Sequence, residues 1–205
     1  MSEFTYEKND TYSHLECFEW DNVWFEHTEK SDRNRVYYVG DSISCGVRRI
    51  ATAESGDSVL FDGFGTSKAI DHPLFIESLK LYAKQLNRMD AIIFNNGLHG
   101  WHLGENEYEA FYDTVINQIR ELYPDVPTFI VLSTYVRDEG RRERVKGRNR
   151  AALRVAEKYS LPVIDLYRVS EENSDLCSDG VHFLNDGYKL FAREILTVLK
   201  ENGIE

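Results

Sequence analysis

Short apolar runs alternate with longer stretches of helical periodicity along most of the chain. The runs are rich in β-branched and aromatic residues and end at glycine or polar residues, which is typical of buried strands that leave the core for a loop. Each run is too short for a buried helix. Five strands are therefore predicted, at residues 37–39, 59–62, 91–94, 128–132 and 161–166.

Apolar residues between these runs recur at spacings of three and four, which predicts helices packed against the strands. The repeats are Phe75, Leu79, Tyr82 and Leu86; Tyr108, Tyr112, Val115, Ile119 and Leu122; Val145, Asn149, Ala152, Ala156 and Tyr159; and Tyr188, Phe191, Ile195 and Leu199. Strands that alternate with helices predict a parallel sheet covered on both faces. We therefore predict an α/β fold with three α/β/α layers and a five-stranded parallel sheet in a flavodoxin-like layout, whose ligand crevice lies at the carboxyl ends of the strands.

The chain of 205 residues is long enough for one well-buried core, so a single domain over residues 1–205 is expected. Residues 1–30 are acidic and aromatic, and we expect them to form an N-terminal extension that packs on the core. Trp20 and Trp24 are four apart and would share one face if this segment were helical.

The net charge of -11 argues against nucleic acid or an anionic membrane as the main partner, because both attract basic surfaces. The first ten residues lack the basic start and apolar stretch of a signal peptide, and no run is long enough to span a bilayer. Cys17, Cys45 and Cys177 are odd in number and lack metal-type spacing, which favours reduced thiols. A soluble cytoplasmic protein is expected.

Candidate chemistry lies at two places far apart in the sequence. Gly40-Asp41-Ser42 follows the first predicted strand, and Asp179 and His182 stand three apart before the last predicted helix. Gly-Asp-Ser also occurs in ordinary turns, and Asp179 could merely cap a turn. A serine hydroxyl becomes a nucleophile only when a base removes its proton, and a histidine is the commonest base.

The chain resembles the GDSL-type esterases and acyltransferases of the SGNH hydrolase superfamily over nearly its whole length. Four blocks carry the resemblance, at residues 40–43 (Gly-Asp-Ser-Ile), 61–67 (Phe-Asp-Gly-Phe-Gly-Thr-Ser), 94–100 (Phe-Asn-Asn-Gly-Leu-His-Gly) and 179–182 (Asp-Gly-Val-His). The third block departs from the common Gly-x-Asn-Asp form, and is similar to a branch in which asparagine precedes the glycine.

The resemblance implies roles for these residues. Ser42 would be the nucleophile, His182 its base and Asp179 the acid that orients the imidazole. The oxyanion would be stabilised by the backbone N–H of Ser42, a glycine N–H and an asparagine amide. For these last two donors we favour Gly65 over its rival Gly63, and Asn95 over its rival Asn96.

The implied reaction is hydrolysis of small acyl esters through an acyl-enzyme, without a cofactor. The expected partner is a small-molecule or carbohydrate ester, and acetyl groups on carbohydrate are one substrate class that relatives of this kind use. Two alternatives stay open from the sequence. One is an O-acyltransferase that uses the same three residues, and the other is a non-catalytic binding module on the same fold.

Two further features allow more than one interpretation. His99 and His102 form a His-x-x-His pair, but no further ligand is obviously placed, so we predict no metal and expect His99 and Trp101 to line the pocket wall. Residues 137–150 contain seven basic side chains in an otherwise acidic chain. They predict either a solvated face or lid, or a platform for an acidic sugar or a phosphate-bearing substrate.

Overall fold

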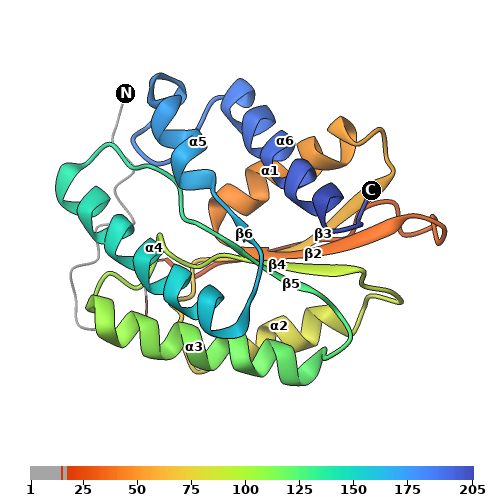
Figure 1. Cartoon of the computed structure of the whole chain (residues 1–205), viewed down its shortest axis with the longest axis horizontal. Coiled ribbons are helices and arrows are strands. Elements are labelled where there is room, and N and C mark those ends of the chain that lie inside the picture. Colours follow the sequence, from red (N-terminus) through yellow and green to blue (C-terminus); the bar gives the residue numbers. More distant parts are fainter. Residues whose placement is uncertain (1–14, 16–17) are drawn as a thin grey trace.

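A six-stranded sheet forms the centre of the protein, seen in a computed structural model that describes residue 15 and residues 18–205 (Figure 1). The strands are β1 (Asp21–Trp24), β2 (Asn34–Gly40), β3 (Val59–Thr66), β4 (Ala91–Phe94), β5 (Thr128–Val131) and β6 (Val163–Ile164). Their order is β1-β3-β2-β4-β5-β6, and every neighbouring pair is parallel except β1 with β3.

The five predicted parallel strands correspond to β2 to β6. The chain first moves from β2 to β3 on one side, then crosses to β4, β5 and β6 on the other. This is the flavodoxin-like order, and it confirms the predicted three-layer α/β fold. Ligands bind in such sheets where the winding changes direction, outside the carboxyl ends of the strands. Here that place is the end of β2, between β3 and β4.

The sixth strand was not predicted. Residues 21–24 form β1, which pairs antiparallel with Gly63–Thr66 of β3, so a helical face shared by Trp20 and Trp24 is wrong. The physical reason is the open edge of β3, whose unpaired backbone groups accept another strand. Residues 1–14 and 16–17 of the predicted extension, including Cys17, lie outside the described residues.

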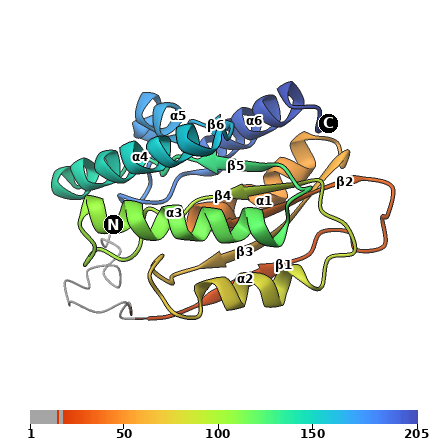
Figure 2. The ribbon, with the colours of Figure 1, turned by 60° about the horizontal axis from the view of Figure 1, so that its bottom comes forward.

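Helices cover both faces of the sheet, as Figures 1 and 2 show. They are α1 (Ser42–Glu54), α2 (Phe75–Ala83), α3 (Glu105–Leu122), α4 (Glu139–Tyr159), α5 (Leu166–Glu172) and α6 (Asn185–Glu201), with a short 3₁₀ turn at Ser174–Leu176. One core lies under α1, α5 and α6, and the other under α2, α3 and α4. Side chains of β2 alternate between them, with Val36 and Tyr38 in the first core and Tyr37 and Val39 in the second, as expected for a strand buried on both faces.

Some element boundaries differ from the prediction. The fifth predicted strand is shorter, because β6 covers only Val163–Ile164 and the Asp165 carboxylate accepts the Arg168 N–H (2.9 Å) to start α5. Helix α2 ends at Ala83, one turn before the predicted Leu86.

Strand β3 also continues further than predicted. Gly63 and Gly65 lie inside it, not in a loop after it. A Cβ on Gly63 would overlap the side chain of Arg48, and a Cβ on Gly65 would overlap Cys45 Sγ. The two glycines therefore serve the close packing of α1 on the sheet.

Candidate active site

Ser42 is the first residue of α1, directly after β2. Asp41 caps the helix: its side-chain oxygen accepts the Ile43 N–H (3.0 Å), and its carbonyl accepts the Ser44 hydroxyl (2.7 Å). The Asp41 side chain is completely buried, and this burial raises its pKa. The first N–H groups of a helix have no acceptor within it, so the Ser42 hydroxyl sits beside backbone donors at the positive end of α1.

His182 meets Ser42 across 140 residues of sequence. The Ser42 Oγ lies 2.8 Å from His182 Nε2, and His182 Nδ1 lies 2.8 Å from an oxygen of Asp179. An ionised carboxylate can only accept hydrogen bonds, so Nδ1 carries the proton and Nε2 is left to accept from the hydroxyl. The structure thus brings the three predicted triad residues into one hydrogen-bonded chain.

The turn from Asp179 to His182 is held by hydrogen bonds within it and by the Arg137 N–H, which donates to the Gly180 carbonyl (2.8 Å). The second oxygen of Asp179's carboxylate accepts the backbone N–H groups of Val181 (3.0 Å) and His182 (2.8 Å). Gly180 has φ +105°, a conformation that favours glycine. The Ser178 N–H and hydroxyl both donate to the His182 carbonyl, at 2.8 and 2.9 Å, which closes the turn behind the imidazole.

The hydrogen bonds to the Asp179 carboxylate also affect its pKa. Burial by itself would raise the pKa of this carboxyl, but the hydrogen bonds from the backbone and ring of His182 and from Val181 outweigh it, so the pKa lies below its usual value. Asp179 is therefore ionised at neutral pH and can stabilise an imidazolium on His182.

The two asparagines of the third block point in opposite directions. Asn95 Nδ2 donates to Ser133 Oγ (3.0 Å), which follows β5, whereas Asn96 Nδ2 donates to the Lys68 carbonyl (2.9 Å), which follows β3. Because β2 lies between β3 and β4, the hydrogen bond of Asn96 joins the loops that follow the two strands on either side of β2. The hydrogen bond of Asn95 joins the loops after β4 and β5.

The two predicted glycines differ in what they face. An ideal Cβ on Gly65 would lie 3.3 Å from the Asp41 carbonyl oxygen, so Gly65 packs against the turn that carries Ser42. Gly63 instead faces Arg48, further from the serine. Of the two glycines, Gly65 therefore lies nearer to the turn that carries Ser42.

His99 and Trp101 are both almost fully buried, at 2% and 6% exposure. The ring of His99 lies against Trp20, with ring centroids 6.1 Å apart and the rings edge to face. The guanidinium of Arg148 lies 4.6 Å from the centre of the Trp101 ring, with Arg141 and Arg144 also over it. Their predicted contact with substrate stays a prediction.

The basic segment is exposed in part and held against the protein in part: Arg137, Arg144 and Arg150 are exposed, and Arg148 is buried. It begins just before α4 and forms the first half of that helix, and three of its side chains bind the neighbouring loops. Arg137 donates to the Cys177 carbonyl (2.5 Å), Arg144 to the carbonyls of Trp101 and Leu103, and Arg148 to three carbonyls of the β4–α3 loop. These contacts were missed from the sequence, where the segment shows only as a run of charge.

Other candidate groups lie outside the serine–histidine chain. His102 binds the Asp71 carboxylate (2.8 Å), and among the described residues no group of three or more histidine, cysteine or acidic side chains could hold a metal ion. Burial raises the pKa of the Cys45 and Cys177 thiols, so neither is activated as a nucleophile. Within residue 15 and residues 18–205, no helix is long and apolar enough to cross a membrane.

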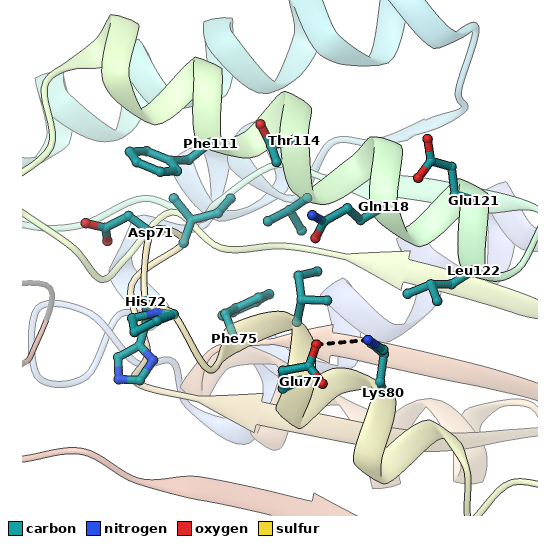
Figure 3. A pocket seen from close by; sticks show the side chains of 14 residues that line it. Asp71, His72, Phe75, Glu77, Lys80, Phe111, Thr114, Gln118, Glu121 and Leu122 are labelled. Carbon is teal, nitrogen blue, oxygen red and sulfur yellow. Dashed lines mark hydrogen bonds and ion pairs between the residues drawn. The ribbon is translucent and has the colours of Figure 1, made fainter.

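A groove of about 490 Å³ opens between α2 and α3 (Figure 3). Its walls include Asp71, Phe75, Phe111 and Leu122, and none of the three triad residues lines it. The groove is therefore separate from the hydrogen-bonded chain of Ser42, His182 and Asp179.

No family model and no curated protein matches the sequence. Solved structures do match. A lipase/acylhydrolase from Enterococcus faecalis has 19% identity and a TM-score of 0.66, with 82% of this chain and 96% of that chain covered. The chain has the fold of the GDSL-type acyl hydrolases. This confirms the predicted resemblance to the SGNH superfamily at the level of the fold.

Two other structures share this GDSL-type fold. An acetyl xylan esterase has 16% identity and a TM-score of 0.63, with 80% of this chain and 99% of that chain covered. The catalytic domain of peptidoglycan O-acetyltransferase A from Streptococcus pneumoniae has 16% identity and a TM-score of 0.63, with coverages of 82% and 94%. The fold therefore occurs both in an esterase and in an acyltransferase.

Proposed function

We propose that the protein is a serine esterase that hydrolyses small acyl esters through an acyl-enzyme. The observation that carries the proposal is the hydrogen-bonded chain from Ser42 through His182 to Asp179, with both distances at 2.8 Å. A non-catalytic binding module would have no need of a hydroxyl, an imidazole and an ionised carboxylate in this order.

The reaction begins when Ser42 Oγ attacks the acyl carbon and its proton passes to His182 Nε2. Asp179 stabilises the imidazolium that forms. The tetrahedral intermediate then collapses, the bond to the alcohol breaks, and His182 gives the proton to the departing alcohol oxygen. Water repeats the sequence on the acyl-enzyme, with His182 again as the base, and releases the carboxylic acid and free Ser42.

The negative charge on the carbonyl oxygen needs hydrogen-bond donors. The backbone N–H of Ser42 is one, at the positive end of α1. For the amide donor we now favour Asn96 over Asn95, because its hydrogen bond to the Lys68 carbonyl joins the loops after β3 and β4, the strands on either side of β2. Each amide has a second hydrogen to offer. Gly65 remains the proposed glycine donor, supported by its contact with the turn before Ser42.

Acetyl esters of carbohydrate are the substrate class that we propose to test first. The support is the shared fold with a protein described as an acetyl xylan esterase and with a peptidoglycan O-acetyltransferase. The second of these also favours one alternative, in which a sugar hydroxyl in place of water attacks the acyl-enzyme. Product analysis with and without an added alcohol separates hydrolysis from transfer.

The deciding experiment is treatment with a fluorophosphonate, followed by mass spectrometry of the digested protein. An adduct is expected on Ser42, and it should be lost in Ser42→Ala and His182→Ala. Ser58→Ala, which changes an exposed serine after α1, is the matched control and should label normally. A protein that labels elsewhere, or that still labels in Ser42→Ala, would contradict the serine mechanism.

A further inference from the structure

The loop between β4 and α3 is held by its carbonyl groups. Arg148, on α4, donates from Nη1 to the carbonyls of Gly97 (3.1 Å) and His99 (2.6 Å), and from Nη2 to that of Gly100 (2.5 Å). The Arg148 side chain is 2% exposed, and its guanidinium lies 4.9 Å from the centre of the Tyr108 ring. One buried cation thus fixes three peptide groups of the loop.

Two further side chains extend this arrangement to both ends of the loop. The Tyr108 hydroxyl, on α3, donates to the Asn96 carbonyl, and Arg144 donates to the carbonyls of Trp101 and Leu103 (3.0 Å for Leu103). Six of the eight carbonyls between residues 96 and 103 are therefore bound by side chains of α3 and α4. A peptide group is planar, so fixing its carbonyl also fixes the backbone on either side.

The position of the Asn96 side chain depends on this loop. Asn96 directly precedes Gly97, the first residue that Arg148 binds, and its own carbonyl is bound by Tyr108. The flat guanidinium fork makes several hydrogen bonds in a fixed geometry, whereas a lysine ammonium is a single mobile point of charge. A lysine has three N–H donors on a single nitrogen, so it cannot reproduce the two-nitrogen fork that binds these three carbonyls.

We propose that Arg148 is a positioning residue of the active site, which acts by holding the loop so that the Asn96 amide meets the oxyanion. The assignment rests on the proposed esterase function. Oxyanion donors act when they are fixed in advance where the charge develops, so a loosened loop slows the chemical step and leaves substrate binding largely unchanged.

Steady-state kinetics on p-nitrophenyl acetate tests the assignment with Arg148→Gln and Arg148→Lys. Both variants are expected to lose about a hundredfold in kcat, the size of effect that a misplacement of about 1 Å produces, with KM within about twofold of wild type. Arg154→Gln, on an exposed stretch of the same helix, is the matched control and should keep kcat within about twofold.

General destabilisation is controlled by Val155→Ala, which opens the core beneath α4 without touching the loop. Tyr108→Phe is a milder second variant, because it removes one hydrogen bond from the Asn96 carbonyl and leaves the ring in place. It should lower kcat by about fivefold to tenfold with KM unchanged. If the Arg148 variants do not fold, wild-type kcat in Tyr108→Phe would overturn the proposal that the held loop positions Asn96.

Hydrogen exchange of residues 96–103 gives a readout that needs no turnover. Exchange should be at least about tenfold faster in Arg148→Gln than in wild type, and unchanged in Val155→Ala. The assignment is overturned if Arg148→Lys keeps wild-type kcat, if KM rises as much as kcat falls, or if Val155→Ala loses as much kcat. A wild-type protein that cleaves no ester would refute the proposed function alone, and unchanged exchange would then refute the clamp as well.

Discussion

Two loops meet at the carboxyl end of β2, and they are held in opposite ways. The turn from Asp179 to His182 is fixed mainly by its own neighbours, since Asp179 accepts from backbone groups two and three residues ahead, and Arg137 adds one backbone hydrogen bond to the Gly180 carbonyl (2.8 Å). The β4–α3 loop is fixed from a distance, because Arg148 binds carbonyls that lie 48 to 51 residues earlier in the chain. The first loop supplies the proposed base, and the second supplies the proposed amide donor.

This difference predicts different responses to mutation. The turn from Asp179 to His182 should be most sensitive to changes in its own residues, and such changes should lower the catalytic rate before they destabilise the fold. The distantly held loop should be sensitive to changes in α3 and α4 that touch no substrate. The experiments below probe this contrast.

The largest expected effect is on the base. His182→Ala should lower kcat by about 10⁶-fold, since the members of a triad act as a unit. Far-UV circular dichroism and the melting temperature should stay close to those of wild type, because the ring lies at the site and not in either core. A variant that keeps more than about a hundredth of wild-type kcat would show that His182 is not the base.

Substitution of Asn96 should mainly lower kcat, whereas substitution of Asn95 should mainly lower the free energy of unfolding. Asn96→Ala should lower kcat by about 10²- to 10³-fold, the usual cost of one oxyanion donor. Asn95→Ala should cost less in kcat but about 1–3 kcal/mol of unfolding free energy, because it leaves the buried Ser133 hydroxyl without this donor. Kinetics and urea unfolding of both variants measure this, and the reverse pattern would restore Asn95 as the oxyanion donor.

Substitution of Gly180 tests whether the turn from Asp179 to His182 requires the positive φ of this residue. Gly180→Ala places a side chain at φ +105° and should lower the unfolding free energy by about 1–3 kcal/mol. Gly140→Ala, inside α4 with no positive φ, should instead stabilise the protein by about 0.5–1 kcal/mol. Equal effects in urea unfolding would show that the turn imposes no special conformation.

The smallest expected effect is on the pH dependence of the unfolding free energy. The pKa of Asp179 is lowered in the folded protein, so its charge contributes stability at pH values above the unfolded pKa of about 4, and this contribution disappears as the pH falls through the folded value. The difference in unfolding free energy between wild type and Asp179→Asn should therefore be constant from about pH 5 to 7 and shrink below about pH 4. Asp175→Asn, an exposed change nearby, is the control. A difference that grows in acid would reverse the assigned direction of the shift.

The sequence was informative wherever the determinants are local. Five strands followed from short apolar runs, and the flavodoxin-like layout followed from their alternation with helices. The spacing of Asp179 and His182 was already consistent with one turn. The strand β1 was not found, because what makes residues 21–24 a strand is the open edge of β3, and no pattern within the segment shows it.

The β4–α3 loop was harder to predict for the same reason. The choice between Asn95 and Asn96 depends on the order of the strands in the sheet, since Asn95 binds a residue after β5 and Asn96 binds a residue after β3. The role of Arg148 depends on the packing of α4 against that loop. In the sequence it is one of seven basic residues, and spacing alone does not distinguish it from the exposed ones.

The glycines of β3 also have an implication for the protein's evolution. Arg48 occupies the space above Gly63, and Cys45 occupies the space above Gly65, so each glycine and its partner on α1 share one volume. A larger residue on the strand could be accommodated only if its partner became smaller in the same lineage. We therefore expect homologues with a larger residue at position 65 to have a smaller one at position 45. The same coupling is expected between positions 63 and 48.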